Sequence, residues 1–231
     1  MLSESPAPLL AALRLWDDRL PARDGAWNMA VDEALLTSRP GAAGPVLRVY
    51  RWDRPTLSFG YFLPEAQAQA ARQPGEAMVR RWTGGGLVHH AGAFTWTLVV
   101  PQGEAFCRVR PAESYAQLHG ALARALSVAG LGPVSVVPAA SAAPTGGLCA
   151  EAPAPGDVLR RGRKFAGAGQ RRTREGLLHQ GVLFLPEAQL PADFPVQLAA
   201  ALAGEVTLFR AEWAAPAPVA RYSDPAWNAR R

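Results

Sequence analysis

Apolar residues recur at helical spacing in several stretches of this chain, and each stretch is bounded by residues that start or end helices. In the first stretch, Asp24 stands where a capping side chain belongs, and Pro40 and Gly41 follow the last apolar turn. The longest stretch begins at a proline and stops before Gly130. Gly204 ends the last one in the same way. The predicted helices are 25–37, 64–72, 111–129 and 194–203.

Other stretches alternate apolar and polar residues, or are short and continuously apolar, which is typical of strands. A turn at 53–55 separates the first two, and Gly162 stands at the centre of a predicted hairpin. The predicted strands are 46–52, 56–62, 78–82, 94–100, 134–137, 157–161, 163–169 and 177–185. Residues 1–22 fit a short strand or a helix, and the pattern beyond Gly204 determines little. Because no repeat or linker divides the chain, we expect residues 1–231 to form a single α+β domain with mainly antiparallel sheets and flanking helices.

Composition narrows the class of protein. The chain has 231 residues, of which 49% are hydrophobic and 19% charged, so a folded globular protein is expected. No apolar run reaches the roughly 18 residues of a membrane helix, and no signal peptide is recognisable. Two cysteines make neither a disulfide framework nor a zinc site, which favours a reducing cytoplasm. A net charge of +5 suits an acidic partner, but it fits an ordinary solvated surface equally well.

A run of three glycines is the first feature that indicates chemistry. Gly84, Gly85 and Gly86 follow a predicted strand that contains two arginines near its end, and His89 and His90 come shortly after. Without side chains, the glycine amides can face an oxygen-rich ligand. The segment is neither a dinucleotide-binding fingerprint nor a phosphate-binding P-loop, because the third glycine or the Gly-Lys-Ser/Thr sequence is missing. A plain glycine-rich turn is the alternative.

The second feature is a lysine that stands alone among arginines. Lys164 is the single lysine among 24 cationic side chains, and it lies in a strand punctuated by Gly162, Gly167 and Gly169. An ammonium is a compact charge with a tunable pKa, whereas a guanidinium is a planar fork. Cys149 precedes Lys164 by fifteen residues and follows a loop rich in Ala, Ser, Pro and Gly. A nearby ammonium lowers a thiol pKa and prepares the thiolate for acyl transfer. A buried structural cysteine and a lysine kept by chance remain the alternatives.

Four ordered motifs resemble one family. Residues 80–90 are similar to the Arg-Arg, Thr, triple-glycine and histidine signature of the superfamily of lipoate–protein ligases, octanoyltransferases and biotin–protein ligases. Residues 28–35, then 47–61, and finally 163–181 resemble its first helix, first strand pair and lysine strand. The resemblance covers about residues 20–190 and implies the catalytic-domain fold of these enzymes. Two positions depart from it: Ala91 stands where many members have Asp, and Gly169 where many have Ala, the second of which we expect to be neutral.

Within the superfamily, the placement of Cys149 before Lys164 is closest to the octanoyltransferases of the cysteine–lysine (LipM) type. That resemblance implies that octanoate moves from acyl carrier protein, through a thioester on Cys149, to a lysine of an apo lipoyl domain or glycine-cleavage H protein. It implies no cofactor, no accessory C-terminal domain, no nucleic acid or membrane partner, and a cytoplasmic monomer. Beside Cys149 and Lys164 as catalytic residues, the substrate-binding residues that it implies are Arg81, Gly84, Gly85, Gly86, Leu87, Val88, His89, His90 and Gly167.

Two rivals remain open at this point. An ATP-dependent lipoate–protein ligase would use Arg81, residues 86–89 and Lys164 to hold a nucleotide and an acyl phosphate, with Mg²⁺. A non-catalytic protein that binds acyl groups or their carriers would keep the pocket without forming a covalent adduct.

Overall fold

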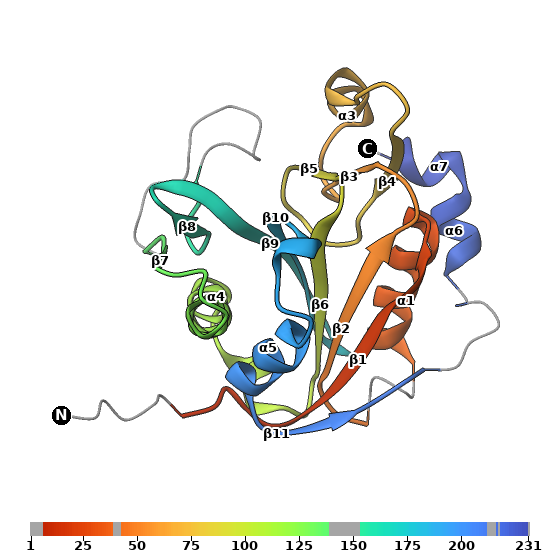
Figure 1. Ribbon diagram of the computed structural model, residues 1–231. Helices are drawn as coiled ribbons and strands as arrows, with labels where there is room; N and C mark the ends of the chain where they lie inside the picture. The colour runs from red at the N-terminus through yellow and green to blue at the C-terminus, as the bar shows by residue number, and fades with distance from the viewer. Residues whose placement is uncertain (1–6, 39–42, 139–152, 212–215, 217, 231) are drawn as a thin grey trace.

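The computed structural model describes residues 7–38, 43–138, 153–211, 216 and 218–230. Within these ranges the chain forms an eight-stranded sheet and a three-stranded sheet, with helices against both faces of the larger one (Figure 1). The large sheet has the spatial order β11 (Ala203–Leu208), β1 (Leu10–Arg23), β2 (Val46–Trp52), β6 (Ala93–Pro101), β10 (Gly176–Pro186), β9 (Arg163–Thr173), β8 (Val158–Arg160) and β7 (Val134–Val136). The small sheet has the order β4 (Ala77–Arg80), β3 (Thr56–Phe59) and β5 (Leu87–His90). The helices are α1 (Gly25–Thr37), α3 (Glu65–Ala71), α4 (Pro111–Val128), α5 (Phe194–Leu202), α6 (Val219–Ser223) and α7 (Pro225–Asn228), with short 3-10 helices η1 (Ala105–Arg108) and η2 (Glu187–Gln189).

Most neighbouring strands of the large sheet run antiparallel. The long strands β6, β10 and β9 pair this way at the centre, and β10 lies between the other two. The exceptions are at one edge, where β1 runs parallel to both β2 and β11. In the small sheet β3 is parallel to β4 and antiparallel to β5. The prediction of an α+β chain with mainly antiparallel sheets is therefore confirmed.

Side-chain alternation along the strands creates two hydrophobic cores. Leu47 and Val49 of β2 are fully buried in the cluster that contains α4 and α5, whereas Val46 packs with α1 on the opposite face. Successive side chains of a strand point to opposite faces, so one strand serves both cores. Burying each such side chain contributes about 1.5–3 kcal/mol to stability.

The four predicted helices and most predicted strands are present, with small changes at their ends. Asp24 caps α1 by accepting a hydrogen bond from the Trp27 amide at 2.7 Å. The second predicted strand is shorter than expected: β3 ends at Phe59, and the turn that follows brings Gly60 against the triple glycine. The prediction that Gly204 ends a helix is wrong, because α5 already ends at Leu202 and Gly204 lies inside β11. For residues 1–22 the sequence pattern fits a strand or a helix, and in the structure residues 10–22 belong to β1.

Arg80 anchors the C-terminal helices to the small sheet and so fixes the start of the glycine segment. Its buried guanidinium donates to the carbonyl oxygens of Tyr61 at 2.8 Å, Leu63 at 2.7 Å and Arg230 at 2.9 Å. The Trp227 indole donates back to the Arg80 carbonyl at 2.9 Å. In Figure 1, α7 accordingly lies beside β4 at the end of the chain, and α6 lies beside α1. Among the described helices, none is both long enough and apolar enough to span a membrane.

Candidate active site

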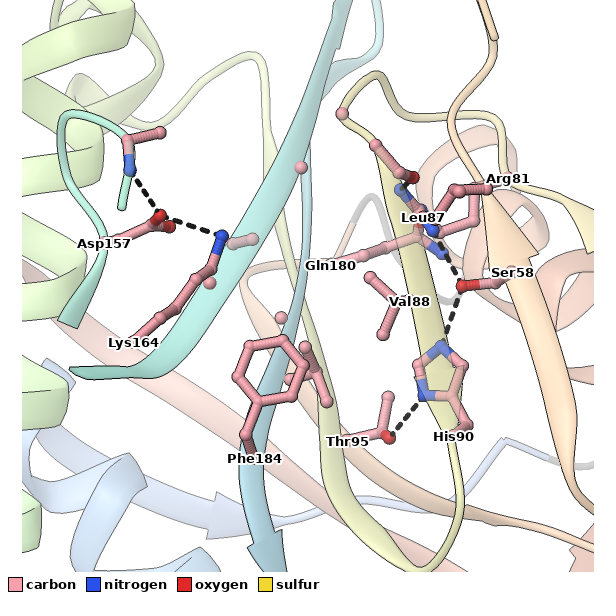
Figure 2. Close-up of a pocket in the computed structure, with 18 of the residues that line it drawn as sticks. Ser58, Arg81, Leu87, Val88, His90, Thr95, Asp157, Lys164, Gln180 and Phe184 are labelled. Atoms are coloured by element: carbon pink, nitrogen blue, oxygen red, sulfur yellow. Dashed lines mark hydrogen bonds and ion pairs between the residues drawn. The ribbon is translucent and has the colours of Figure 1, made fainter. Parts of the chain in front are cut away.

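A pocket lies between the central strands β9 and β10 of the large sheet and strand β5 of the small one. Figure 2 shows Lys164 and Asp157 on one side of it, Arg81, Ser58 and His90 on the other, and Val88 and Phe184 between them. Its wall consists of Met29, Tyr50, Trp52, Ser58, Arg81, Gly85, Gly86, Leu87, Val88, His90, Thr95, Ala154, Asp157, Lys164, Gly167, Ala168, Gly169, Gln180, Gly181, Val182 and Phe184. The pocket therefore offers an apolar stretch with polar groups at both sides, which suits an acyl chain that ends in a carbonyl.

On the β5 side, a buried hydrogen-bond relay holds Arg81 and His90 in place. Arg81 Nη1 donates to Ser58 Oγ at 2.7 Å, and Nη2 donates to the Gly86 carbonyl at 2.8 Å. Ser58 Oγ lies 2.7 Å from His90 Nε2. Because the arginine donates to the serine oxygen, the serine hydroxyl is free to donate to the histidine. The relay fixes the guanidinium against the glycine segment.

His90 is a neutral wall residue in this arrangement. Its ring stacks on Trp52 with centroids 4.1 Å apart, and it is buried. Burial, together with the neighbouring Arg81 charge, lowers the pKa of His90 well below its usual value of 6.5. A neutral imidazole that accepts from Ser58 shapes the pocket, and its low pKa makes it a weak base at neutral pH.

The triple glycine presents bare backbone to the pocket. Gly85 adopts φ +97°, a conformation that L side chains rarely adopt, so a turn of this shape requires glycine. Among the residues that the structure describes, no atom accepts a hydrogen bond from the amides of Gly84, Gly85 or Gly86. The amides of Gly85 and Gly86, which line the pocket, are therefore available to a ligand oxygen.

Gly169 is where β9 passes closest to the glycine segment. A Cβ built on Gly169 would lie 2.6 Å from the Gly84 carbonyl oxygen and 3.0 Å from Thr83 Oγ1. Many members of the family have Ala at this position, which this backbone could not accept without a shift. Glycine is needed because the two backbones approach each other here.

On the opposite side of the pocket, Lys164 pairs with an aspartate that the sequence analysis did not single out. Lys164 Nζ lies 2.8 Å from Asp157 Oδ2, and both side chains are mostly buried, with 12% and 8% exposed. The same carboxylate oxygen accepts the Ala154 amide at 2.7 Å. Asp157 thus connects the lysine to the chain segment that arrives from Cys149.

Gly167 leaves the space that the lysine side chain occupies. A Cβ built there would lie 2.8 Å from Lys164 Cε, 3.1 Å from its Nζ and 3.0 Å from Asp157 Oδ1. Any larger residue would push the ammonium away from its present position. Gly167 is predicted to bind substrate; in the structure it lines the pocket and leaves room for the lysine side chain.

Below the pocket, a buried polar network supports Gln180, a wall residue from β10. Gln180 Nε2 donates to Asp32 Oδ2 at 2.7 Å, and its Oε1 accepts from Thr83 at 2.7 Å. Asp32 in turn pairs with Arg48 at 2.7 Å, and neither side chain is exposed. A buried ion pair that is fully hydrogen-bonded fixes geometry more than it adds stability. It ties α1, β2 and β10 together beneath the glycine segment.

Most predicted site residues meet in this pocket. Its wall contains Lys164, Arg81, Gly85, Gly86, Leu87, Val88, His90 and Gly167. Gly84 and His89 are not part of the wall, and His89 instead approaches Glu76, with Nδ1 and Oε1 2.8 Å apart. His89 and His90 are adjacent residues of β5 and point to opposite faces of the strand, so their side chains have different surroundings. Cys149 lies outside the described residues.

The second cysteine lies elsewhere. The Cys107 thiol donates towards the Val100 and Pro101 carbonyls, each at 3.2 Å, and packs against the main core. Burial raises the pKa of this thiol, which disfavours the reactive thiolate. Cys107 does not line the pocket.

Sequence comparison places the chain in a family. Residues 24–190 match the model of the lipoyl protein ligase A/B catalytic domain, and the chain belongs to this family. Curated relatives include the octanoyltransferase LipM of Kyrpidia tusciae, which is 35% identical over 175 residues, covering 71% of this chain and 64% of the relative. The LipM of Staphylococcus aureus is 32% identical over 171 residues, covering 69% of this chain and 62% of the relative. The chain thus spans somewhat less than two thirds of the length of these relatives.

Solved structures confirm the expected lipoate ligase fold. Protein Ta0514 from T. acidophilum with bound lipoic acid superposes with a TM-score of 0.69 at 19% identity, covering 95% of this chain and 99% of that one. A lipoate–protein ligase A bound with ATP superposes with a TM-score of 0.66 at 18% identity, covering 95% and 98%. At these identities the likeness defines the fold alone.

Proposed function

We propose that this chain is an octanoyltransferase of lipoate biosynthesis. It takes octanoate from acyl carrier protein and transfers it to a lysine of an apo lipoyl domain or glycine-cleavage H protein. The proposal is carried by one observation: Lys164, Asp157 and the open amides of the glycine segment meet in a single pocket with an apolar wall. The identity to LipM enzymes over about 70% of the chain supports the same activity.

The chain segment before Ala154 permits Cys149 to act in this pocket. Ala154 belongs to the pocket wall and is held by Asp157. The five residues from Cys149 to Ala154 span at most about 17 Å when extended, so connectivity allows the thiol to reach Lys164. The ammonium would then favour the thiolate, because an adjacent positive charge stabilises the anionic form.

The proposed reaction has two transfers. The Cys149 thiolate attacks the thioester carbonyl, a new carbon–sulfur bond forms, and the carrier thiolate leaves and takes up a proton. A neutral acceptor amine then attacks the acyl-enzyme, so that the carbon–nitrogen bond forms, the bond to Cys149 breaks and the amine loses a proton. Glycine amides would hold the carbonyl oxygen as it gains charge; losing such a donor typically slows a reaction about 100–1000-fold. Because the donor is already a thioester, this reaction uses neither ATP nor Mg²⁺, and we propose that it takes place in the cytoplasm.

A direct comparison of substrates tests this proposal. The purified chain is given an apo lipoyl domain and either octanoyl carrier protein without ATP or free lipoate with ATP and Mg²⁺. We expect a mass gain of one octanoyl group on the domain only in the first mixture. Modification only in the second mixture would establish the ligase alternative, and modification in neither would favour a non-catalytic binding protein.

A further inference from the structure

The tip of the β8–β9 hairpin concentrates positive charge beside the pocket. Arg160 ends β8, Arg161 and Gly162 form the turn, and Arg163 begins β9. Arg161 and Arg163 are exposed, and Arg160 is half-buried with its guanidinium 5.2 Å from the centre of the Phe165 ring. The next residue along β9 is Lys164, which belongs to the pocket wall. A molecule held at the tip is therefore adjacent to the proposed reaction centre.

The backbone of the turn is poorly suited to an arginine. Arg161 has φ +52° and Gly162 has φ +74°, so both central residues are left-handed. Two-residue hairpin turns of this kind favour Asn-Gly, because asparagine tolerates the left-handed region and other side chains are disfavoured there. Within the described ranges, Arg161 is the one residue other than glycine with positive φ. The fold is therefore less stable with arginine at position 161 than it would be with asparagine.

The charge pattern of the tip adds a second cost. Arg160 and Arg163 are direct partners across the hairpin, and like charges in this position repel each other. Among the described residues, no carboxylate forms an ion pair with Arg160, Arg161 or Arg163. The aspartate nearest in sequence, Asp157, is engaged with Lys164. Arg160 has its contact with the Phe165 ring, but within the described ranges neither the fold of the hairpin nor an ion pair accounts for Arg161 and Arg163.

We propose that this hairpin tip, residues 160–163, is the docking site for the acyl donor, an acidic carrier protein whose acyl group hangs on a phosphopantetheine arm. This inference rests on the proposed function. Arginine forks match phosphate and carboxylate oxygens in two-point hydrogen bonds. The donor presents both groups: carboxylates on its surface, and a phosphodiester at the root of the arm. With the phosphodiester at the tip, the arm runs along the start of β9 towards Lys164.

The charge of the tip favours the donor over the acceptor protein. The acceptor brings a lysine, whose ammonium three arginines would repel before it loses its proton. The donor brings an anion at the same point of its structure. Complementary charge of this kind mainly speeds association and makes it sensitive to salt.

The test compares Arg161→Asn, and the double change Arg161→Asn with Arg163→Gln, with the unaltered full chain. Arg174→Gln is the matched control, because Arg174 follows the other end of β9, is 93% exposed and pairs with Glu175. Two donors are used: octanoyl carrier protein, and octanoyl-pantetheine, which has the same thioester but neither phosphate nor protein. KM for each donor and for the acceptor is measured between low and high salt, together with the melting temperature.

We expect Arg161→Asn to melt at the same or a higher temperature and yet to raise KM for octanoyl carrier protein about two- to fivefold at low salt. The double change should raise it about tenfold and flatten its salt dependence. KM for octanoyl-pantetheine and for the acceptor should stay unchanged, as should every constant of Arg174→Gln. An unchanged KM for the carrier, or an equal rise for octanoyl-pantetheine, would overturn the proposal. A rise confined to the acceptor would reassign the surface to it.

Failure of the proposed function gives a different result. If the unaltered chain transfers octanoate from neither donor, the transferase proposal is wrong. The docking proposal is then decided by titrating octanoyl carrier protein into the unaltered chain and the double variant. Equal affinities would reject the docking site, and a weaker, less salt-dependent complex for the variant would support it.

Discussion

Replacing Gly167 by alanine should impair the proposed octanoyl transfer while leaving the fold intact. The added methyl would lie 2.8 Å from Lys164 Cε and 3.1 Å from its Nζ. Ordinary contacts between such atoms are about 3.5–4.0 Å, so the ammonium must move by about 0.5–1 Å. The atoms in the way belong to the end of a flexible side chain, and a rotamer adjustment costs about 0.5–1.5 kcal/mol.

The cost of moving Lys164 and the gain from restricting the unfolded chain should nearly cancel in the free energy of unfolding. Alanine restricts the unfolded chain more than glycine does, which stabilises the fold by about 0.4–1 kcal/mol where the backbone permits it. No positive φ is recorded for Gly167. The melting temperature should therefore change by only a few degrees. A misplacement of about 1 Å at a reacting centre can lower kcat/KM by about 100-fold.

The assay is octanoyl transfer from carrier protein, read as kcat/KM, beside thermal unfolding of the same preparation. Gly120→Ala is the matched control, because Gly120 lies in α4, away from the pocket, and its new methyl would come no closer than 3.9 Å to Arg124. The control should keep full activity and gain stability. If Gly167→Ala folds normally and transfers at the unaltered rate, the position of Lys164 does not matter and the reasoning is refuted.

Three further predictions concern the same site and its surroundings. Gly169→Ala should lower the free energy of unfolding by about 1–3 kcal/mol, because its methyl meets the backbone carbonyl of Gly84; urea titration measures this, and an unchanged midpoint contradicts it. Asp157→Asn removes the charged partner of Lys164 and should lower kcat/KM about 10–100-fold, whereas unaltered kinetics would show that the ion pair is dispensable. His90 and His179 are both buried, with pKa values well below 6.5 because burial disfavours the charged ring. Their unfolded forms bind protons below about pH 6.5 and their folded forms do not, so stability is complete above that pH and falls below it. His119 is also buried and its pKa is lowered, so it acts in the same direction. A histidine that stays neutral in the fold costs up to about 1.4 kcal/mol of stability one pH unit below its unfolded pKa. Unfolding titrations at pH 7.5 and 5.5 test this, and His179→Gln should reduce the difference.

Local sequence patterns predict much of the fold because apolar periodicity, capping residues and turn residues mark the helices and the central strands. Asp24 caps α1 as expected, and Gly169 in the lysine strand marks a close approach of two backbones. The prediction for Gly204 is wrong because a glycine that follows an apolar helix can either end that helix or lie in the next strand. The sequence pattern is the same in both cases. Only the parallel pairing of β11 with the distant β1 decides this.

In the candidate site, too, some residues are identifiable from the sequence and others only from the fold. Lys164 and the triple glycine are identifiable because their residue types are unusual in this sequence. Asp157 is an ordinary aspartate until the β8–β9 hairpin folds back and places its carboxylate 2.8 Å from the lysine. The sequence alone does not distinguish the roles of His89 and His90. The pairing of β5 with β3 decides that His90 faces the pocket. A β-strand alternation over 87–90 would have separated the two, but that strand was not predicted.

Intact-mass analysis after mixing the chain with octanoyl carrier protein, without acceptor or ATP, tests the central claim most directly. The account predicts the mass of one octanoyl group on the protein, released by hydroxylamine as a thioester would be. The adduct should be lost in Cys149→Ala and kept in Cys107→Ala, whose half-buried thiol does not line the pocket. An unaltered mass in a preparation that still modifies the lipoyl domain, or full transfer by Cys149→Ala, would contradict the thioester mechanism.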